Sequence, residues 1–209
     1  MRRSDLMETP AMHSTRPRLR RDTQETRDRL LDEVGVLLAA QGPTFSLPDL
    51  ARRAGVATAT VYRHFEAVHD AHHEYYVRLV DGLVASLEAV STRLKGRARF
   101  EAVCRTWVAL AADWGLAATH IRSYEGFLVR VRRGDPPTST LYRSLEPVLR
   151  ELIESGDLPK QDLDYAVLVW ITAFDERVVV DLATALGWSA RRIARRLATT
   201  VIQALGGTA

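Results

Sequence analysis

The residues best suited to bind another molecule lie together in positions 46–65, which read Ser-Leu-Pro-Asp-Leu-Ala-Arg-Arg-Ala-Gly-Val-Ala-Thr-Ala-Thr-Val-Tyr-Arg-His-Phe. Ser46 is a favourable helix N-cap, and Asp49 completes a capping box three residues later. Gly55 suits the turn that ends this short helix, and a second short helix is predicted over residues 58–64. Two short helices joined by a glycine turn are typical of a helix-turn-helix, whose second helix enters the major groove of DNA.

The side chains of this stretch suit contact with double-stranded DNA. Thr58 and Thr60 would place hydroxyl and methyl groups at the start of the second helix, within reach of base edges. The donors that follow them can reach phosphate oxygens. The predicted DNA-binding residues are Ser46, Arg52, Thr58, Thr60, Tyr62, Arg63 and His64. Spacing alone leaves open a second interpretation, in which the two helices form only a packed corner.

From about Thr26 to Tyr76 the chain resembles the TetR family of bacterial transcriptional repressors. The resemblance rests on the apolar pattern of the first helix, the Ser-Leu-Pro-Asp-Leu-Ala start at Ser46, and the segments 54–56 and 60–65. It implies a one-component regulator, usually a repressor and not an enzyme, that binds a pseudo-palindromic operator as a homodimer. The half-sites of such an operator lie about 34–36 Å apart or more. The resemblance also implies a C-terminal domain that binds a small-molecule effector.

Three residues depart from the family pattern. Ala57 stands where a serine usually caps the second helix, a role that Thr58 could take one position later. Val68 stands where a lysine usually lies near the DNA backbone, and Ala71 replaces a larger apolar residue. Residues 1–21 hold six arginines and two acidic residues, so this basic arm could offset the lost lysine by neutralising phosphates.

Helical periodicity runs through the chain, whereas strand signals are scarce. The predicted fold is all-α, with an N-terminal three-helix helix-turn-helix domain followed by a six-helix ligand-binding and dimerisation domain. We assign residues 1–21 to a disordered basic arm, 22–68 to the DNA-binding domain and 69–209 to the effector-binding and dimerisation domain. The helices are predicted over residues 23–40, 47–54, 58–64, 70–94, 98–113, 117–132, 139–154, 163–186 and 189–205.

Composition favours a soluble, cytoplasmic protein without a membrane partner. The 209 residues carry a net charge of +3, and 46% of them are apolar, which is enough for a sizeable core. The apolar run 165–174 is half of the roughly 20 residues that a membrane-spanning helix needs. The single cysteine, Cys104, excludes an internal disulfide.

The aromatic residues after position 100 predict where an effector would bind. Because effector pockets are mostly apolar, we expect a small apolar or aromatic ligand, with His120 and Cys104 as polar contributors. Ordinary core packing is the alternative for each residue. The predicted ligand-binding residues are Trp107, Leu110, Trp114, Tyr124, Phe127, Leu128, Trp170 and Phe174.

The last two predicted helices are strongly apolar, and the resemblance implies that they form a four-helix bundle with a second copy. The apolar residues that indicate this interface are Val167, Leu168, Ile171, Val178, Val179, Leu182, Ile193, Leu197, Val201 and Leu205. Arg191, Arg192, Arg195 and Arg196 form a basic stripe on the last helix. This stripe is assigned to a solvated face, or to pairing with Asp175, Glu176 or Asp181.

A histidine cluster supports an alternative function. His69, His72 and His73 share one helical face, so with Asp70 or Glu74 they could hold zinc in a metal-binding or metal-responsive protein. The other interpretations are a polar helix start and a group that responds to pH. The metalloprotease motif that begins at His73 lacks its second histidine, because Val77 stands there. No cofactor, metal or catalytic set is predicted.

Overall fold

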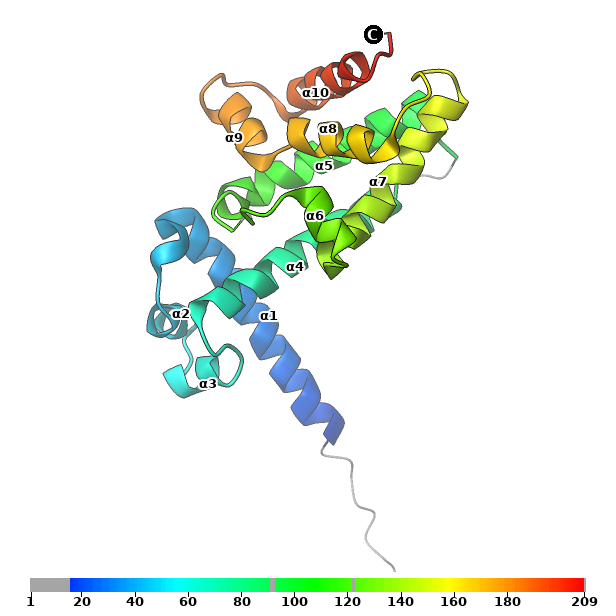
Figure 1. Cartoon of the computed structure of the whole chain (residues 1–209). Coiled ribbons are helices and arrows are strands. Elements are labelled where there is room, and N and C mark those ends of the chain that lie inside the picture. The colour runs from blue at the N-terminus through cyan, green and yellow to red at the C-terminus, as the bar shows by residue number, and fades with distance from the viewer. Residues whose placement is uncertain (1–15, 91–92, 122, 209) are drawn as a thin grey trace, which may run out of the picture.

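The computed structural model describes residues 16–90, 93–121 and 123–208, and within these ranges it is helical throughout, without a strand (Figure 1). The predicted all-α class is therefore confirmed. Residues 1–15, most of the predicted basic arm, lie outside the described residues. None of the described helices combines the length and apolar character needed to cross a bilayer.

The N-terminal unit consists of a long helix and the helix-turn-helix. Its elements are α1 (Arg16–Gln41), the 3-10 turn η1 (Gly42–Thr44), α2 (Leu47–Ala54) and α3 (Thr58–Tyr62). The prediction for the start of α1 was wrong: residues 16–21 are helical, and Asp22 accepts a hydrogen bond from Thr26 inside the helix instead of capping it. Pro17 is tolerated because the first turn needs no backbone donor.

The predicted capping of α2 is present. The Asp49 carboxylate accepts a hydrogen bond from the Ser46 backbone N–H at 2.9 Å, and the Ser46 hydroxyl accepts one from the Asp49 N–H at 3.3 Å. Gly55 ends the helix with φ = 66°, a conformation that disfavours other residues. The local sequence thereby fixes both ends of α2 and the turn into α3.

The remaining helices differ from the prediction at their ends and, in two places, in their continuity. The prediction of one helix over residues 117–132 was wrong, because residues 117 and 118 belong to α5, the described residues between 119 and 126 are not helical, and the next helix begins at Phe127. The described part of the C-terminal domain therefore has seven helices instead of the predicted six.

Gly115 lies inside α5 instead of ending it, since this glycine lets α9 approach closely: an added Cβ would lie 3.1 Å from Val180. The long helix predicted over 163–186 is two helices, because Asp175 caps the second by accepting from the Arg177 N–H. The elements are α4 (Val68–Glu88), α5 (Gly96–Ala118), α6 (Phe127–Arg132), α7 (Pro136–Glu154), α8 (Leu163–Ala173), α9 (Glu176–Thr184) and α10 (Ala190–Ala204).

Two hydrophobic cores share helix α4. Its first half contributes Ala71 and Tyr75 to the core of the N-terminal unit, and its second half contributes Val80, Leu83 and Val84 to the larger C-terminal core. The boundary predicted at residues 68 and 69 thus falls in the first turn of a helix that runs through both units (Figure 1). No flexible linker separates the two cores at this point.

Most residues expected at a dimer interface are buried within their own chain. Val167, Ile171, Val179 and the apolar residues of α10 pack in the C-terminal core. The larger apolar side chains that α8, α9 and the following turn leave exposed are Tyr165, Val178 and Leu186. The buried residues therefore serve the core of their own chain, because they pack against α5 and α7.

Gly35 allows α1 to pack against α4, and we predict that Gly35→Ala destabilises the fold. An added Cβ would lie 2.5 Å from the Tyr75 hydroxyl oxygen, and Tyr75 is buried. Overpacking of this kind costs about 1–3 kcal/mol, which exceeds the helix propensity that alanine gains. The matched control is Gly82→Ala in α4, where no described atom lies within 4 Å, so propensity should raise stability by up to about 1 kcal/mol. Urea unfolding of both variants measures this difference, and equal effects would contradict it.

Candidate DNA-binding surface and ligand cavity

Helix α3 presents the residues predicted to contact DNA. Thr58, Tyr62 and Arg63 are exposed, whereas Val61 is buried and anchors the helix to the N-terminal core. The Arg63 guanidinium donates to the Thr60 hydroxyl oxygen at 3.0 Å, so Thr60 orients Arg63. Thr58, Thr60, Tyr62 and Arg63 thus lie on one short helix or at its C-terminal end, and Val61 holds the opposite side of that helix in the core.

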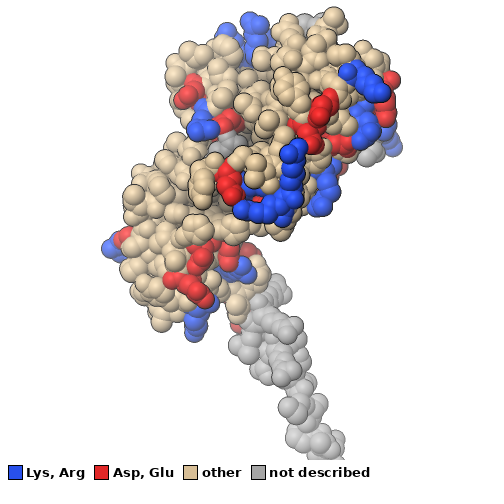
Figure 2. All heavy atoms as spheres, in the orientation of Figure 1, with Lys and Arg blue, Asp and Glu red and all other residues tan. Residues whose placement is uncertain are grey.

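Other predicted DNA-binding residues have structural partners. Ser46 caps α2, and Arg52 pairs with Asp49 within the same helix. His64 is partly buried, and burial together with the nearby Arg27 charge lowers its pKa, which favours the neutral imidazole. On the face of the molecule drawn in Figure 2, acidic and basic side chains are interspersed. Ser46 therefore supports the motif, while Arg52 remains highly exposed beside its acidic partner.

The departures from the family pattern have structural consequences. Ala57 precedes α3, and no side chain caps that helix, so the expectation that Thr58 takes over as cap was wrong. Val68 is partly buried and packs against the N-terminal core. Ala71 is fully buried where α4 meets that core. At position 68 this chain therefore has an apolar contact with the N-terminal core in place of the family's lysine.

The histidine cluster does not form a metal site in the described part of the chain. No group of three or more histidine, cysteine, aspartate or glutamate side chains there could hold a metal ion. His72 instead packs edge-on against Phe45, with ring centroids 5.1 Å apart. Burial, together with the charge of His69, lowers the pKa of His72. His72 therefore joins α4 to the segment before α2, and the metal alternative is not favoured.

A cavity of about 370 Å³ lies within the C-terminal domain, between α4, α5, α6 and α7 and the start of α9. Its wall combines apolar and polar side chains. The apolar part includes the predicted Trp107, Trp114, Phe127 and Phe174, while the fully exposed Tyr124 also lines the cavity. Its polar lining includes Tyr76 and Arg130. The Arg130 guanidinium donates to the Tyr76 hydroxyl at 3.1 Å and to Asp135 at 2.9 Å.

Three predicted ligand-binding residues and one of the two polar candidates lie elsewhere. Trp170 is completely buried and packs against Phe100, with ring centroids 4.7 Å apart. Leu110 and Leu128 are partly exposed but do not line the cavity. Cys104 is buried in the core, where burial raises the pKa of its thiol well above the ordinary value, as expected of an inert cysteine. These residues belong to ordinary packing.

His120 lines a second, more open cavity of about 450 Å³ that also includes the histidine cluster. This second cavity shares Tyr76, Ser123, Tyr124, Glu125 and Arg130 with the first cavity. His120 lies beside the N-terminal unit, since an added Cβ at Gly42 would lie 3.5 Å from its ring. The polar residue predicted for the effector site is thus at the junction of the two cores.

Sequence reasoning missed the contribution of α4 to the cavity. Tyr76, Leu79, Val80 and Leu83 line it from one side. Their spacing places them on one face of the helix, and this spacing was the only sign in the sequence that they act together. It does not separate a cavity wall from a core face, because both are apolar.

Comparisons with known proteins agree with this arrangement. The sequence model described as bacterial regulatory proteins of the tetR family matches residues 30–67. No curated protein matches the chain. A tetR family regulatory protein from Rhodococcus RHA1 is 16% identical, with a TM-score of 0.72 over 88% of this chain and 99% of that one.

Two further structures share the fold. The regulator FadR from Bacillus subtilis, in complex with stearoyl-CoA, is 16% identical, with a TM-score of 0.70 over 84% of this chain and 97% of that one. PfmR, a TetR family transcriptional regulator from Thermus thermophilus, is 18% identical, with a TM-score of 0.68 over 84% and 98% of the two chains. At these identities the similarity concerns the fold alone.

The capped helix-turn-helix ahead of an all-helical domain places the protein in the class of helix-turn-helix transcriptional regulators. Residues 30–67 match the TetR family model, and the chain has the fold of solved TetR regulators. The resemblance inferred from residues 26–76 is therefore confirmed.

The lowered pKa of His72 predicts a stability that depends on pH. The imidazole has its ordinary pKa near 6.5 when the chain is unfolded and a lower one when it is folded, so protonation favours the unfolded state. The free energy of unfolding should therefore fall below about pH 6.5, with a slope of at most about 1.4 kcal/mol per pH unit from this group. Urea unfolding between pH 5 and pH 8 should show a shallower slope for His72→Gln. His73→Gln is the control because His73 is exposed; equal slopes in both variants would contradict the prediction.

Proposed function

We propose that this TetR family regulator is a repressor that binds a pseudo-palindromic operator as a homodimer and is released by a small apolar or aromatic ligand. The observation that carries the DNA-binding part is the exposed face of α3, where Thr58, Thr60, Tyr62 and Arg63 lie on a helix anchored by Val61. Threonine suits base edges, and tyrosine and arginine suit phosphates. Repression and the two-fold operator rest on the resemblance to TetR repressors.

The homodimer is supported by large apolar side chains that remain exposed on or beside the last helices. Tyr165, Val178 and Leu186 are large apolar side chains left exposed near α8 and α9. A two-fold axis at this surface would bury them against their counterparts. The last helices are thus the proposed interface, through these residues instead of those in the core.

The cavity beside α4 is the proposed effector site. Its volume of about 370 Å³ and its aromatic wall suit a small apolar or aromatic molecule. Trp107 lines it, and its buried indole N–H has no acceptor among the described residues, so a ligand oxygen could accept from it. Arg130 could meet an acidic end of the ligand. The stearoyl-CoA bound by the FadR of similar fold supports a ligand with an apolar part.

Helix α4 is the element through which this ligand would act on DNA binding. Tyr76 and Val80 line the cavity, whereas Tyr75 and Glu74 hold the N-terminal unit, the latter by an ion pair of 2.7 Å with Arg27. A ligand that favours a different position of α4 would shift both recognition helices relative to their half-sites. It can release DNA only by its difference in affinity for the two states.

Fluorescence anisotropy with DNA from just upstream of this gene, beside a scrambled duplex at two salt concentrations, tests the DNA-binding proposal. We expect selective binding by the wild type, and about fivefold weaker operator binding by Thr60→Ala with a smaller loss on scrambled DNA, because base contacts carry selectivity. Tyr62→Phe should weaken both duplexes alike if its hydroxyl meets a phosphate. Thr184→Ala on α9 is the control, since its exposed hydroxyl bonds only to its own helix. Binding without selectivity would overturn the proposal.

Filling the cavity tests the effector site. Ala118→Leu adds apolar bulk to the wall, and Ala112→Leu makes the same change at an exposed position of the same helix. Decanoate and 2-naphthoate serve as aliphatic and aromatic probes, and tryptophan fluorescence reports binding because Trp107 and Trp114 lie in the wall. We expect at least one probe to bind the wild type and Ala112→Leu, and Ala118→Leu to bind it about tenfold more weakly. Equal affinity for all three proteins would place the probe elsewhere.

A further inference from the structure

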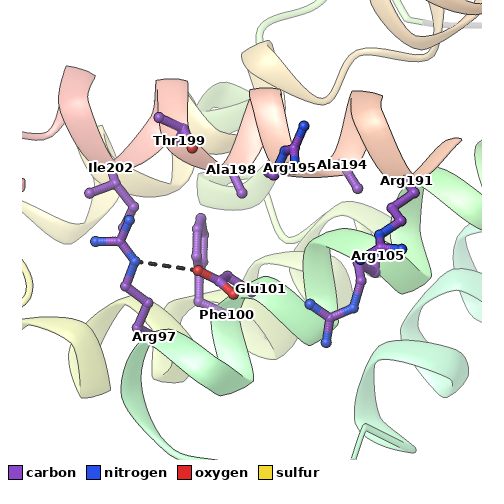
Figure 3. A pocket seen from close by; sticks show the side chains of 10 residues that line it. All are labelled: Arg97, Phe100, Glu101, Arg105, Arg191, Ala194, Arg195, Ala198, Thr199 and Ile202. Atoms are coloured by element: carbon purple, nitrogen blue, oxygen red, sulfur yellow. Dashed lines mark hydrogen bonds and ion pairs between the residues drawn. The ribbon is translucent and has the colours of Figure 1, made fainter. Parts of the chain in front are cut away.

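A third hollow lies in the groove where α10 packs against α5. It measures about 230 Å³, and Figure 3 shows its lining side chains. The Phe100 ring lies between its two ends, below Ala198 of α10. The small side chains of Ala194 and Ala198 leave this space open on the α10 side. The groove is separate from the cavity beside α4, with which it shares no lining residue.

Four guanidinium groups and one carboxylate line the groove, which gives the lining a net charge of +3. Arg97 is occupied, because it lies 3.4 Å from Glu101 and donates to the Thr208 carbonyl oxygen at 2.6 Å. Arg105, Arg191 and Arg195 form no ion pair with any residue that the structure describes. Arg105 and Arg191 lie at the same end of the groove, although they come from different helices (Figure 3).

The position of Arg191 adds to this positive field. It lies in the first turn of α10, a helix of 15 residues whose first turn has no acidic residue. A cation near a helix N-terminus is unfavourable, because the peptide dipoles already make that end positive. The neighbouring Arg192 lies over the Trp188 ring at 4.1 Å, whereas Arg191 and Arg195 line the groove, with the Arg195 guanidinium directed away from Phe100 (Figure 3). An anion between α5 and α10 would offset the charge of Arg191 and Arg195.

We propose that this groove binds a small phosphate monoester with a short apolar part. Guanidinium groups hold phosphate oxygens with paired hydrogen bonds, and a phosphate monoester carries close to two negative charges at pH 7. This charge matches several unpaired arginines better than the single charge of a carboxylate. Phe100, Ala198 and Ile202 form the apolar floor beneath the rest of the molecule, although each exposes 5% of its surface or less. DNA bound at α3 does not compete, because α10 lies at the opposite end of the molecule (Figure 1).

Calorimetric titration of the full chain in about 0.15 M salt tests the site, with hexyl phosphate, inorganic phosphate and hexanol as probes. We expect one hexyl phosphate per chain with a Kd below about 1 mM, weaker binding of inorganic phosphate, and no measurable binding of hexanol. Arg191→Gln combined with Arg195→Gln should weaken hexyl phosphate binding at least tenfold. The matched control is Arg192→Gln with Arg196→Gln, which removes the same charge from the same helix outside the groove and should change binding less than twofold.

Several results would overturn the proposal. Equal weakening by both double variants would reveal attraction to net charge instead of a site, and absence of binding to the wild type would exclude the site. Sedimentation velocity of the same variants tests whether a second copy of the chain occupies the groove. If only Arg191→Gln/Arg195→Gln changes the association state, the groove is part of a subunit interface and the proposal fails. The test is independent of the proposed effector site, because Ala118→Leu should leave hexyl phosphate binding unchanged.

Discussion

The structure depends on one helix serving two hydrophobic cores. Tyr75 of α4 packs against α1 at a point where only glycine fits, and Val80 and Leu83 pack in the C-terminal core. Since the residues between them continue the same helix, the position of the N-terminal unit is tied to the wall of the cavity. The ion pair between Arg27 and Glu74 fixes α1 to this helix at the same level. A change in the packing of α4 therefore cannot remain confined to one unit.

The N-terminal unit has less free positive charge than its arginine content suggests. Arg27, Arg52 and Arg53 pair with Glu74, Asp49 and Glu33. Ion pairing of this kind weakens the long-range attraction between a protein and phosphate groups. Among the described residues, the exposed hydroxyl and guanidinium groups of α3 would therefore contribute to DNA binding more through their positions than through the net charge of the unit. Selectivity is expected to depend on the exact placement of α3, which in turn depends on the packing of α4.

Local signals in the sequence predicted local structure well, and tertiary features less well. Ser46, Asp49 and Gly55 specify the ends of α2 through contacts within a few residues, so these ends were predictable. Gly115 was interpreted as a helix end, but its small size serves the approach of α9, a contact distant in sequence. The aromatic residues divide in the same way: Trp107 lines the cavity and Trp170 fills the core. Both are apolar, and only the packing of distant helices distinguishes them.

The cavity beside α4 and the groove between α5 and α10 differ in whether their charged residues are paired. Their walls are connected by a shared aromatic contact. Beside α4, Arg130 and Arg177 already pair with Asp135 and Asp175, so the positive charges of this cavity wall are largely balanced. In the groove below α10, Arg105, Arg191 and Arg195 lack acidic partners within the described chain, so charge dominates. Phe100 in the groove and Trp107 in the cavity wall both pack against Trp170, with ring centroids 4.7 Å and 6.2 Å away. If a ligand in either site favours a different position of the Trp170 ring, it would change the affinity of the other site for its ligand. Such an effect on affinity must be the same in both directions.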